Sequence, residues 1–121
     1  MAEPVEGEEF FASEGKAVSI YRAFARRLVA LPGVEVRTPR SQVAFRARRA
    51  FAYAWAPSQY LKSDVPVVLS IALPERLASE RVKEVVHPSA SVWMHHLELR
   101  RVKDVDREVI GWILRAYDRA R

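Results

Sequence analysis

The period of the apolar positions changes along the chain, and each change predicts an element. From Lys16 to Leu31 apolar residues recur every three or four positions, which predicts an amphipathic helix that Pro32-Gly33 ends. Ahead of it, residues 8–12 predict one helical turn and residues 1–7 a flexible leader. A second helix is predicted at the C-terminus, with Asp104 as its N-cap. Its expected buried stripe is Val105, Val109, Trp112, Ile113, Ala116, Tyr117 and Ala120.

Between the two helices the period is close to two, which is typical of β-strands. Strands are predicted over residues 34–38, 41–47, 50–56, 65–73, 81–86 and 92–100. The run from Val65 to Leu73 is the most apolar and is expected to be central, while His87-Pro88 is expected to end the strand before it. Residues 58–64 predict a loop, with Tyr60 and Leu61 packed against the fold.

The predicted order is helix, five or six mostly antiparallel strands, helix. Each helix has one apolar stripe, so the simplest packing places both on the same face of one sheet. This is the α+β class: a two-layer sandwich whose second sheet face has no cover from its own chain. The 121 residues fit a single domain, residues 1–121.

Three aromatic residues, Phe51, Tyr53 and Trp55, alternate with alanines. Because large rings gain much from burial, we expect them in the core. The opposite register would place the rings on the uncovered face beside Arg46 and Arg49, where they could stack bases as in readers of single-stranded RNA. With the rings in the core, the uncovered face would show Gln42, Ala44, Arg46, Ala52, Ala54, Val68, Ser70, Ala72, Met94, His96 and Glu98.

This face has a floor of small residues with a few polar groups around it. Such a surface suits a shallow ligand site, but it equally suits a sheet-to-sheet homodimer or a plain solvated face. The sequence leaves these three alternatives open.

The amino-acid composition excludes several classes of protein and indicates a cellular location. There are no cysteines, which excludes disulfides and thiolate metal sites. The N-terminus lacks the apolar core of a signal peptide, and the longest apolar run is about half of what a membrane helix needs. A cytoplasmic protein without membrane contact is therefore expected.

The charge is unevenly distributed. Residues 1–14 contain five glutamates and no base, so the remainder has 20 basic against 10 acidic residues. From residue 37 to residue 56 there is no acid at all, and the arginines there are Arg37, Arg40, Arg46, Arg48 and Arg49. Such a cluster favours a partner that carries phosphates. An incidentally basic surface is the alternative, because arginine is the usual base throughout this chain.

Motifs for catalysis are sparse. The chain has only four glycines, no phosphate-binding loop and no G-x-S-x-G or H-E-x-x-H motif. His95 and His96 are neighbours on a predicted strand, so they point to opposite faces and cannot share a metal ion. His95 is expected to be a hydrogen-bonded core histidine, and His96 to form a polar pair with Glu98. We expect neither metal nor cofactor.

Several motifs carry a resemblance over nearly the whole chain, from about Glu8 to Ala120. They are Arg40-Ser41-Gln42-Val43-Ala44-Phe45, Phe51-Ala52 and His95-His96-Leu97-Glu98-Leu99. In these the chain resembles a family of small bacterial domains of unknown function, common in actinobacteria. Similar domains follow a nuclease-like domain in larger "predicted transport proteins". The resemblance implies an α+β accessory or recognition module near nucleic acid.

Together these observations predict a non-enzymatic binding module that presents an arginine-lined sheet face to an anionic partner, nucleic acid among the candidates. The predicted binding residues are Arg40, Gln42, Arg46, Arg48, Arg49, Ser70, His96 and Glu98. The arginines would hold phosphate or carboxylate, and the others would orient it. One alternative is a small-molecule-binding domain or enzyme that uses His96 and Glu98. Another is a protein–protein adaptor that dimerises through the open face.

Overall fold

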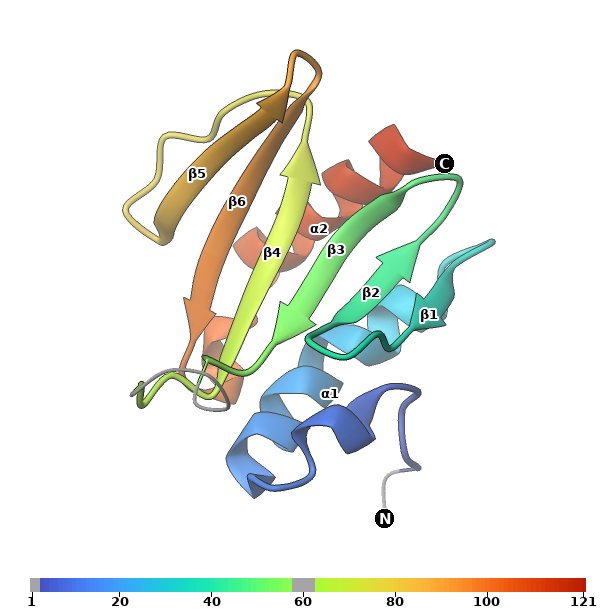
Figure 1. The fold of residues 1–121 in the computed structure, drawn as a ribbon, viewed down its shortest axis with the longest axis vertical. Coiled ribbons are helices and arrows are strands. Elements are labelled where there is room, and N and C mark those ends of the chain that lie inside the picture. The colour runs from blue at the N-terminus through green and yellow to red at the C-terminus, as the bar shows by residue number, and fades with distance from the viewer. Residues whose placement is uncertain (1–2, 58–62) are drawn as a thin grey trace.

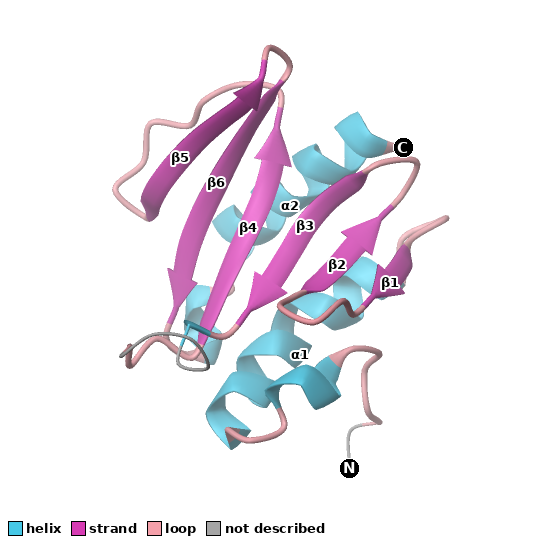
Figure 2. Ribbon diagram, viewed as in Figure 1, coloured by secondary structure: helices cyan, strands magenta, loops and turns pink. Residues whose placement is uncertain are grey.

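The structure, a computed structural model, describes residues 3–57 and 63–121. Within these residues one six-stranded antiparallel sheet has the order β1-β2-β3-β4-β6-β5, and two α-helices lie behind it on one face (Figures 1 and 2). The helical elements are η1 (Glu8–Phe11), α1 (Gly15–Val29), η3 (Val102–Asp104) and α2 (Arg107–Ala120). The strands are β1 (Glu35–Arg37), β2 (Val43–Arg46), β3 (Ala50–Trp55), β4 (Val67–Leu73), β5 (Val82–Ser89) and β6 (Val92–Leu99). The predicted α+β class is confirmed.

The core lies between the sheet and the helices. Helix α1 contributes Ile20, Tyr21 and Phe24, all with no exposed surface. Every residue of β4 is buried, as expected of a central strand that lies between β3 and β6. Helix α1 ends at Val29, earlier than the predicted Leu31. Gly33, in the turn that follows, has φ of 75°, a left-handed conformation that suits glycine.

Helix α2 begins later than the sequence predicts. Its N-cap is Asp106, whose carboxylate accepts a hydrogen bond of 3.0 Å from the Val109 N–H. The prediction that Asp104 is the cap is wrong, because Asp104 lies in η3 and its carboxylate accepts from the N–H groups of Arg100 and Arg101. The buried stripe also differs slightly: Ile110 is buried, and Trp112 only half-buried.

Strand β5 is longer than predicted. It continues through His87-Pro88 to Ser89, so the prediction that this pair ends the strand is wrong. Proline is tolerated because β5 is an edge strand, where a missing N–H breaks no ladder, and because the register against β6 shifts between Val86 and Ser89. The His87 ring stacks on Trp93 with ring centroids 3.6 Å apart.

Strand β3 contains the main departure from the predicted pattern. Phe45 pairs with Ala52 but Arg46 pairs with Ala50, so Phe51 is the extra residue of a β-bulge. Phe51 and Ala52 are both buried, and Phe51 packs on Tyr117 of α2. Beyond the bulge the alternation resumes in the opposite phase.

The predicted core position is therefore confirmed for Phe51 and wrong for Tyr53 and Trp55, which lie half-buried on the uncovered face. Ala52 and Ala54, expected on that face, are in the core. The physical reason is the bulge, which reverses the faces of every later residue in the strand.

Residues 3–7, within the segment for which a flexible leader is predicted, lie along α1. Val5 is buried, and the Tyr21 hydroxyl donates a 2.6 Å hydrogen bond to the Glu6 carbonyl. Arg22 and the Val5 N–H both bond the Glu8 carboxylate and lower the pKa of Glu8 to about 2. Residues 58–62, with the predicted packing of Tyr60 and Leu61, lie outside the described residues.

Candidate functional site

The face of the sheet opposite the helices presents rows of side chains set by the strand register. One row crosses five strands and consists of Ala44, Tyr53, Ser70, His96 and Glu84, each paired with the next. The neighbouring row contains Trp55, Val68 and Glu98. Residues paired across neighbouring strands share a face, so these polar and aromatic groups lie together on the uncovered side.

Two adjoining depressions lie on this face, and both are lined by Trp55 and His96. The first has a volume of about 370 Å³ and the second about 230 Å³. The first is lined by Gln42, Tyr53, Trp55, Ser70, Met94 and His96, and the second by Trp55, Pro57, Ser63, Val68, Lys83, Glu84, His96 and Glu98. Because they share two residues, they form one shallow groove, which we call the sheet groove.

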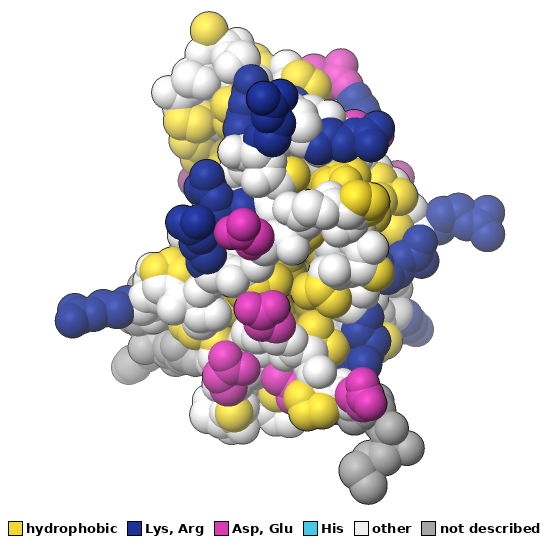
Figure 3. Space-filling model, turned by 90° about the vertical axis from the view of Figure 1, so that its right-hand side faces the viewer, with side chains coloured by type: hydrophobic (Ala, Val, Ile, Leu, Met, Phe, Trp, Pro, Cys, Tyr) yellow, Lys and Arg dark blue, Asp and Glu magenta, His cyan; other side chains and the backbone are white. Residues whose placement is uncertain are grey.

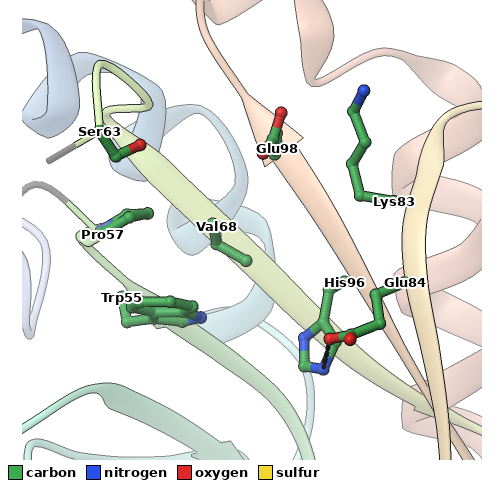
Figure 4. Close-up of a pocket in the computed structure, with 8 residues that line it drawn as sticks. All are labelled: Trp55, Pro57, Ser63, Val68, Lys83, Glu84, His96 and Glu98. Atoms are coloured by element: carbon green, nitrogen blue, oxygen red, sulfur yellow. Dashed lines mark ion pairs between the residues drawn. The ribbon is translucent and has the colours of Figure 1, made fainter. Parts of the chain in front are cut away.

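Figure 4 shows how the second depression is built. Trp55 and Pro57 lie on one side, Val68 lies between, and His96 with Glu84 lies on the other side. The carboxylate of Glu98 and the ammonium of Lys83 lie at the same end of the depression. An apolar floor with a few convergent polar groups is the usual composition of a ligand site.

Ser70 fixes the orientation of His96. Ser70 is 4% exposed, and its hydroxyl lies 2.6 Å from His96 Nδ1. When the hydroxyl donates to Nδ1, the ring proton is on Nε2, which lies 3.9 Å from Glu84 Oε1 at the groove. The hydroxyl of Ser70 is thereby occupied beneath the imidazole, whereas a nucleophilic serine must reach its substrate. Ser70, His96 and Glu84 are therefore better placed to orient one another than to act as nucleophiles.

His95 has the opposite role and confirms its prediction as a core histidine. Its Nε2 accepts from the Leu77 N–H at 2.9 Å, and its Nδ1 lies 2.9 Å from the Trp93 carbonyl, to which it donates. Burial lowers the pKa of His95 below its ordinary value of 6.5. The neutral ring links β6 to the connection that follows β4.

The predicted arginine cluster is divided in space. The N–H groups of Arg48 and Arg49 both donate to the Ala120 carbonyl, at 2.9 and 3.1 Å, so this turn caps the C-terminal end of α2. Arg46 lies opposite Glu35 on β1 and, two residues from Ala44, faces the uncovered side. Arg40 is exposed in the connection before β2. Figure 3 shows basic side chains at several separate places, with acidic ones between them.

The structure therefore brings together four of the predicted binding residues and separates the rest. Gln42, Ser70, His96 and Glu98 line the sheet groove, whereas Arg40, Arg46, Arg48 and Arg49 do not line it. Sequence reasoning missed Lys83 and Glu84, because a register shift between Val82 and Glu84 turns both onto the groove. A break in the alternation of β5 was the only available signal.

One further contact shapes the groove wall. Arg100 lies 3.6 Å from the Glu98 carboxylate and 3.1 Å from that of Asp64. Hydrogen bonding to Arg100 lowers the pKa of Asp64. Glu98 thus contacts Arg100 and also lines the groove.

Among the described residues, no group of three or more His, Asp or Glu side chains is placed to hold a metal ion. In the same residues no helix has the length and apolar character to cross a membrane.

The fold and the groove define a class: a two-layer α+β domain with both helices on one sheet face and an aromatic, polar groove on the other. A family model described as a domain of unknown function, DUF5655, matches residues 7–120. The chain belongs to this family. No curated protein and no solved structure matches the chain.

Proposed function

We propose that this domain is a non-enzymatic binding module whose sheet groove binds single-stranded nucleic acid. The observation that carries the proposal is the position of Tyr53 and Trp55. Both rings are half-buried on the uncovered face and line the groove with Gln42 and His96. Sheet aromatics that are open to solvent are the usual platform on which unpaired bases stack.

The charges near the groove support an anionic chain that runs across it. Arg46 lies on the uncovered face of β2, and Arg37 lies on the same side of β1, 3.5 Å from Glu35. Bases stacked on Tyr53 and Trp55 would leave their phosphates directed toward β1 and β2. Similar domains that follow a nuclease-like domain in larger proteins are in a position that would suit such a module.

The proposal rests on Arg46 more than on Arg48 and Arg49. The last two lie in the turn that caps α2, where their charge already complements the negative end of the helix. Enzymatic use of His96 and Glu98 is less well supported, because the Ser70 hydroxyl engages one nitrogen of the His96 ring.

We expect the isolated protein to bind a fluorescently labelled 12-nucleotide single-stranded RNA or DNA, measured by anisotropy over a salt series. Trp55→Ala and Tyr53→Ala should each weaken binding by roughly 5- to 150-fold, because stacking is worth about 1–3 kcal/mol per base. Arg46→Ala should weaken binding and reduce the slope of log affinity against log salt by about one. Circular dichroism melts of each variant report whether it is folded.

Arg27→Ala is the matched control, because Arg27 is exposed on α1 behind the sheet and the change in net charge is the same. It should leave the affinity nearly unchanged. Absence of binding to RNA and DNA at low salt would refute the proposal, as would binding that is indifferent to both aromatic substitutions. Sedimentation equilibrium in the same buffer tests the rival: a tight dimer that covers Tyr53 and Trp55 would also refute it.

A further inference from the structure

The sheet groove has two chemically different ends. Toward β2 it opens on Gln42 and Tyr53, with Arg46 on the same face. Toward β5 it ends in the carboxylates of Glu84 and Glu98 and the ammonium of Lys83. Two carboxylates at one end do not suit a phosphate, so this end must serve another part of a ligand.

The acidic end matches the edge of one nucleobase. A carboxylate accepts two hydrogen bonds side by side, and guanine presents two adjacent donors, N1–H and N2–H, on the edge that also carries the acceptor O6. An ammonium next to the carboxylate supplies the donor that O6 needs. Adenine lacks this order of donors and acceptors, because its N1 is an acceptor that would face the carboxylate.

Figure 4 shows these groups around one space. The Trp55 ring lies beside Val68, and Glu98 and Lys83 lie at the end of the same depression. Its volume of about 230 Å³ equals that of roughly seven or eight water molecules at about 30 Å³ each, which is room for a flat base rather than for a folded ligand.

The backbone explains why these side chains meet. The register shift between Val82 and Glu84 inserts Lys83 into β5, so that Lys83 and Glu84 both reach the face that normal alternation would give to only one of them. Arg100 forms an ion pair with the Glu98 carboxylate, its Nη2 atom 3.6 Å from Oε1. Glu98 side-chain surface is 32% exposed, which leaves it accessible to a ligand.

We infer, on the basis of the proposed function, that the β5 end of the sheet groove is a guanine subsite. The base stacks on Trp55, Glu98 accepts from N1–H and N2–H, and Lys83 donates to O6. The sugar and phosphate of that nucleotide are directed toward Tyr53 and the arginine of β2, where the next base stacks. Glu98 is then the residue that determines specificity.

The test compares labelled 12-nucleotide RNAs that are uniform except for one central G, A, C or U, with anisotropy at fixed salt. Wild-type protein is expected to bind the G-containing RNA roughly tenfold more tightly than the A-containing one, within the discrimination typical of a bidentate contact. In Glu98→Gln the G:A affinity ratio should fall to between about one and three. The ratio is the readout, because removal of a negative charge raises affinity for every RNA alike.

Glu9→Gln is the matched control: Glu9 is exposed in η1, the element that packs on α1, and its substitution changes the charge equally. Its G:A ratio should equal that of the wild type. A wild-type G:A affinity ratio near one, or a ratio that Glu98→Gln leaves unchanged, overturns the guanine subsite. If binding still depends on Trp55 in that case, the proposed function remains intact. Failure of these RNAs and of the corresponding single-stranded DNAs to bind overturns both.

Discussion

Single residues decide whether the N-terminal segment packs onto the helix layer. Gly7 has φ of 92°, and a Cβ there would meet the Tyr21 hydroxyl and lie 2.9 Å from Val43 Cγ1. The position therefore requires both a left-handed backbone and the absence of a side chain.

Gly7→Ala is expected to lower the free energy of unfolding by roughly 2 kcal/mol or more, from backbone strain together with overlap. Urea unfolding followed by circular dichroism measures it. Gly111→Ala is the contrasting variant: Gly111 lies within α2 with no atom near its added Cβ, so the protein should gain about 0.5–1 kcal/mol. Equal effects of the two substitutions would show that Gly7 is not under this constraint.

Burial of His95 makes the free energy of unfolding depend on pH below about pH 6.5. The folded protein keeps the ring neutral, since burial lowers the pKa of His95, whereas the unfolded chain binds a proton below about 6.5. The stabilisation is complete above pH 6.5 and is lost as the pH falls toward the depressed folded value, at up to about 1.4 kcal/mol per pH unit. Glu8, with its pKa of about 2, loses stabilising charge only at lower pH, below about 4.5.

Urea unfolding at pH 5.0, 5.5, 6.0, 6.5 and 7.5 should therefore show a decline below pH 6.5. His95→Gln keeps an acceptor for the Leu77 N–H but does not titrate, so it should be less stable at pH 7.5 and nearly flat across this range. His87→Gln, at an exposed position, should keep the slope. A slope that survives in His95→Gln would assign it to another group.

At the scale of elements, the side chain of Arg81 connects the edge strand β5 to helix α2. Arg81, just before β5, donates to the Asp106 carboxylate at 2.8 and 2.9 Å, to Glu108 at 3.0 Å and to the Asp104 carbonyl at 2.7 Å. Its guanidinium also lies 6.0 Å from the centre of the Trp112 ring. These contacts join the start of β5 to the N-terminal turn of α2.

Arg81→Ala is expected to cost about 1 kcal/mol of unfolding free energy, a value kept modest because the partner carboxylates are half-exposed. The loss should shrink in 1 M NaCl, which screens surface charge. Arg76→Ala, an exposed arginine in the same connection, should change stability by no more than about 0.5 kcal/mol. A salt-independent loss would point to packing on Trp112 instead.

The order of the elements could be predicted because it depends on local periodicity. The apolar stripe of α1 and the apolar run of β4 are both evident in the sequence, and Gly33 follows the helix. The bulge at Phe51 could not be predicted, because it arises from how β2 and β3 pair and leaves the spacing of aromatic and small residues unchanged. Propensity likewise could not separate Asp104 from Asp106, two acids that cap two successive helices.

At the scale of the whole molecule, the candidate site was predictable on β4, on β6 and at Gln42 ahead of β2, and not elsewhere. Ser70, His96 and Glu98 lie on strands whose alternation is unbroken, so the sequence places them on the right face. Tyr53, Lys83 and Glu84 follow or form irregularities, so the sequence misplaces or omits them. The arginines cluster in sequence, but a hairpin turn carries two of them to the end of α2.

The bulge in β3 also determines which changes of length this hairpin can absorb. Loss of the extra residue Phe51 would leave Arg46 opposite Ala50 and Phe45 opposite Ala52, so Tyr53 would stay opposite Ala44 on the uncovered face. The full-length strand without the bulge would instead pair Phe45 with Phe51, which shifts the register by one residue and turns Tyr53 and Trp55 into the helix layer. A deletion of one residue here should therefore preserve the binding face, whereas loss of the bulge at constant length should not.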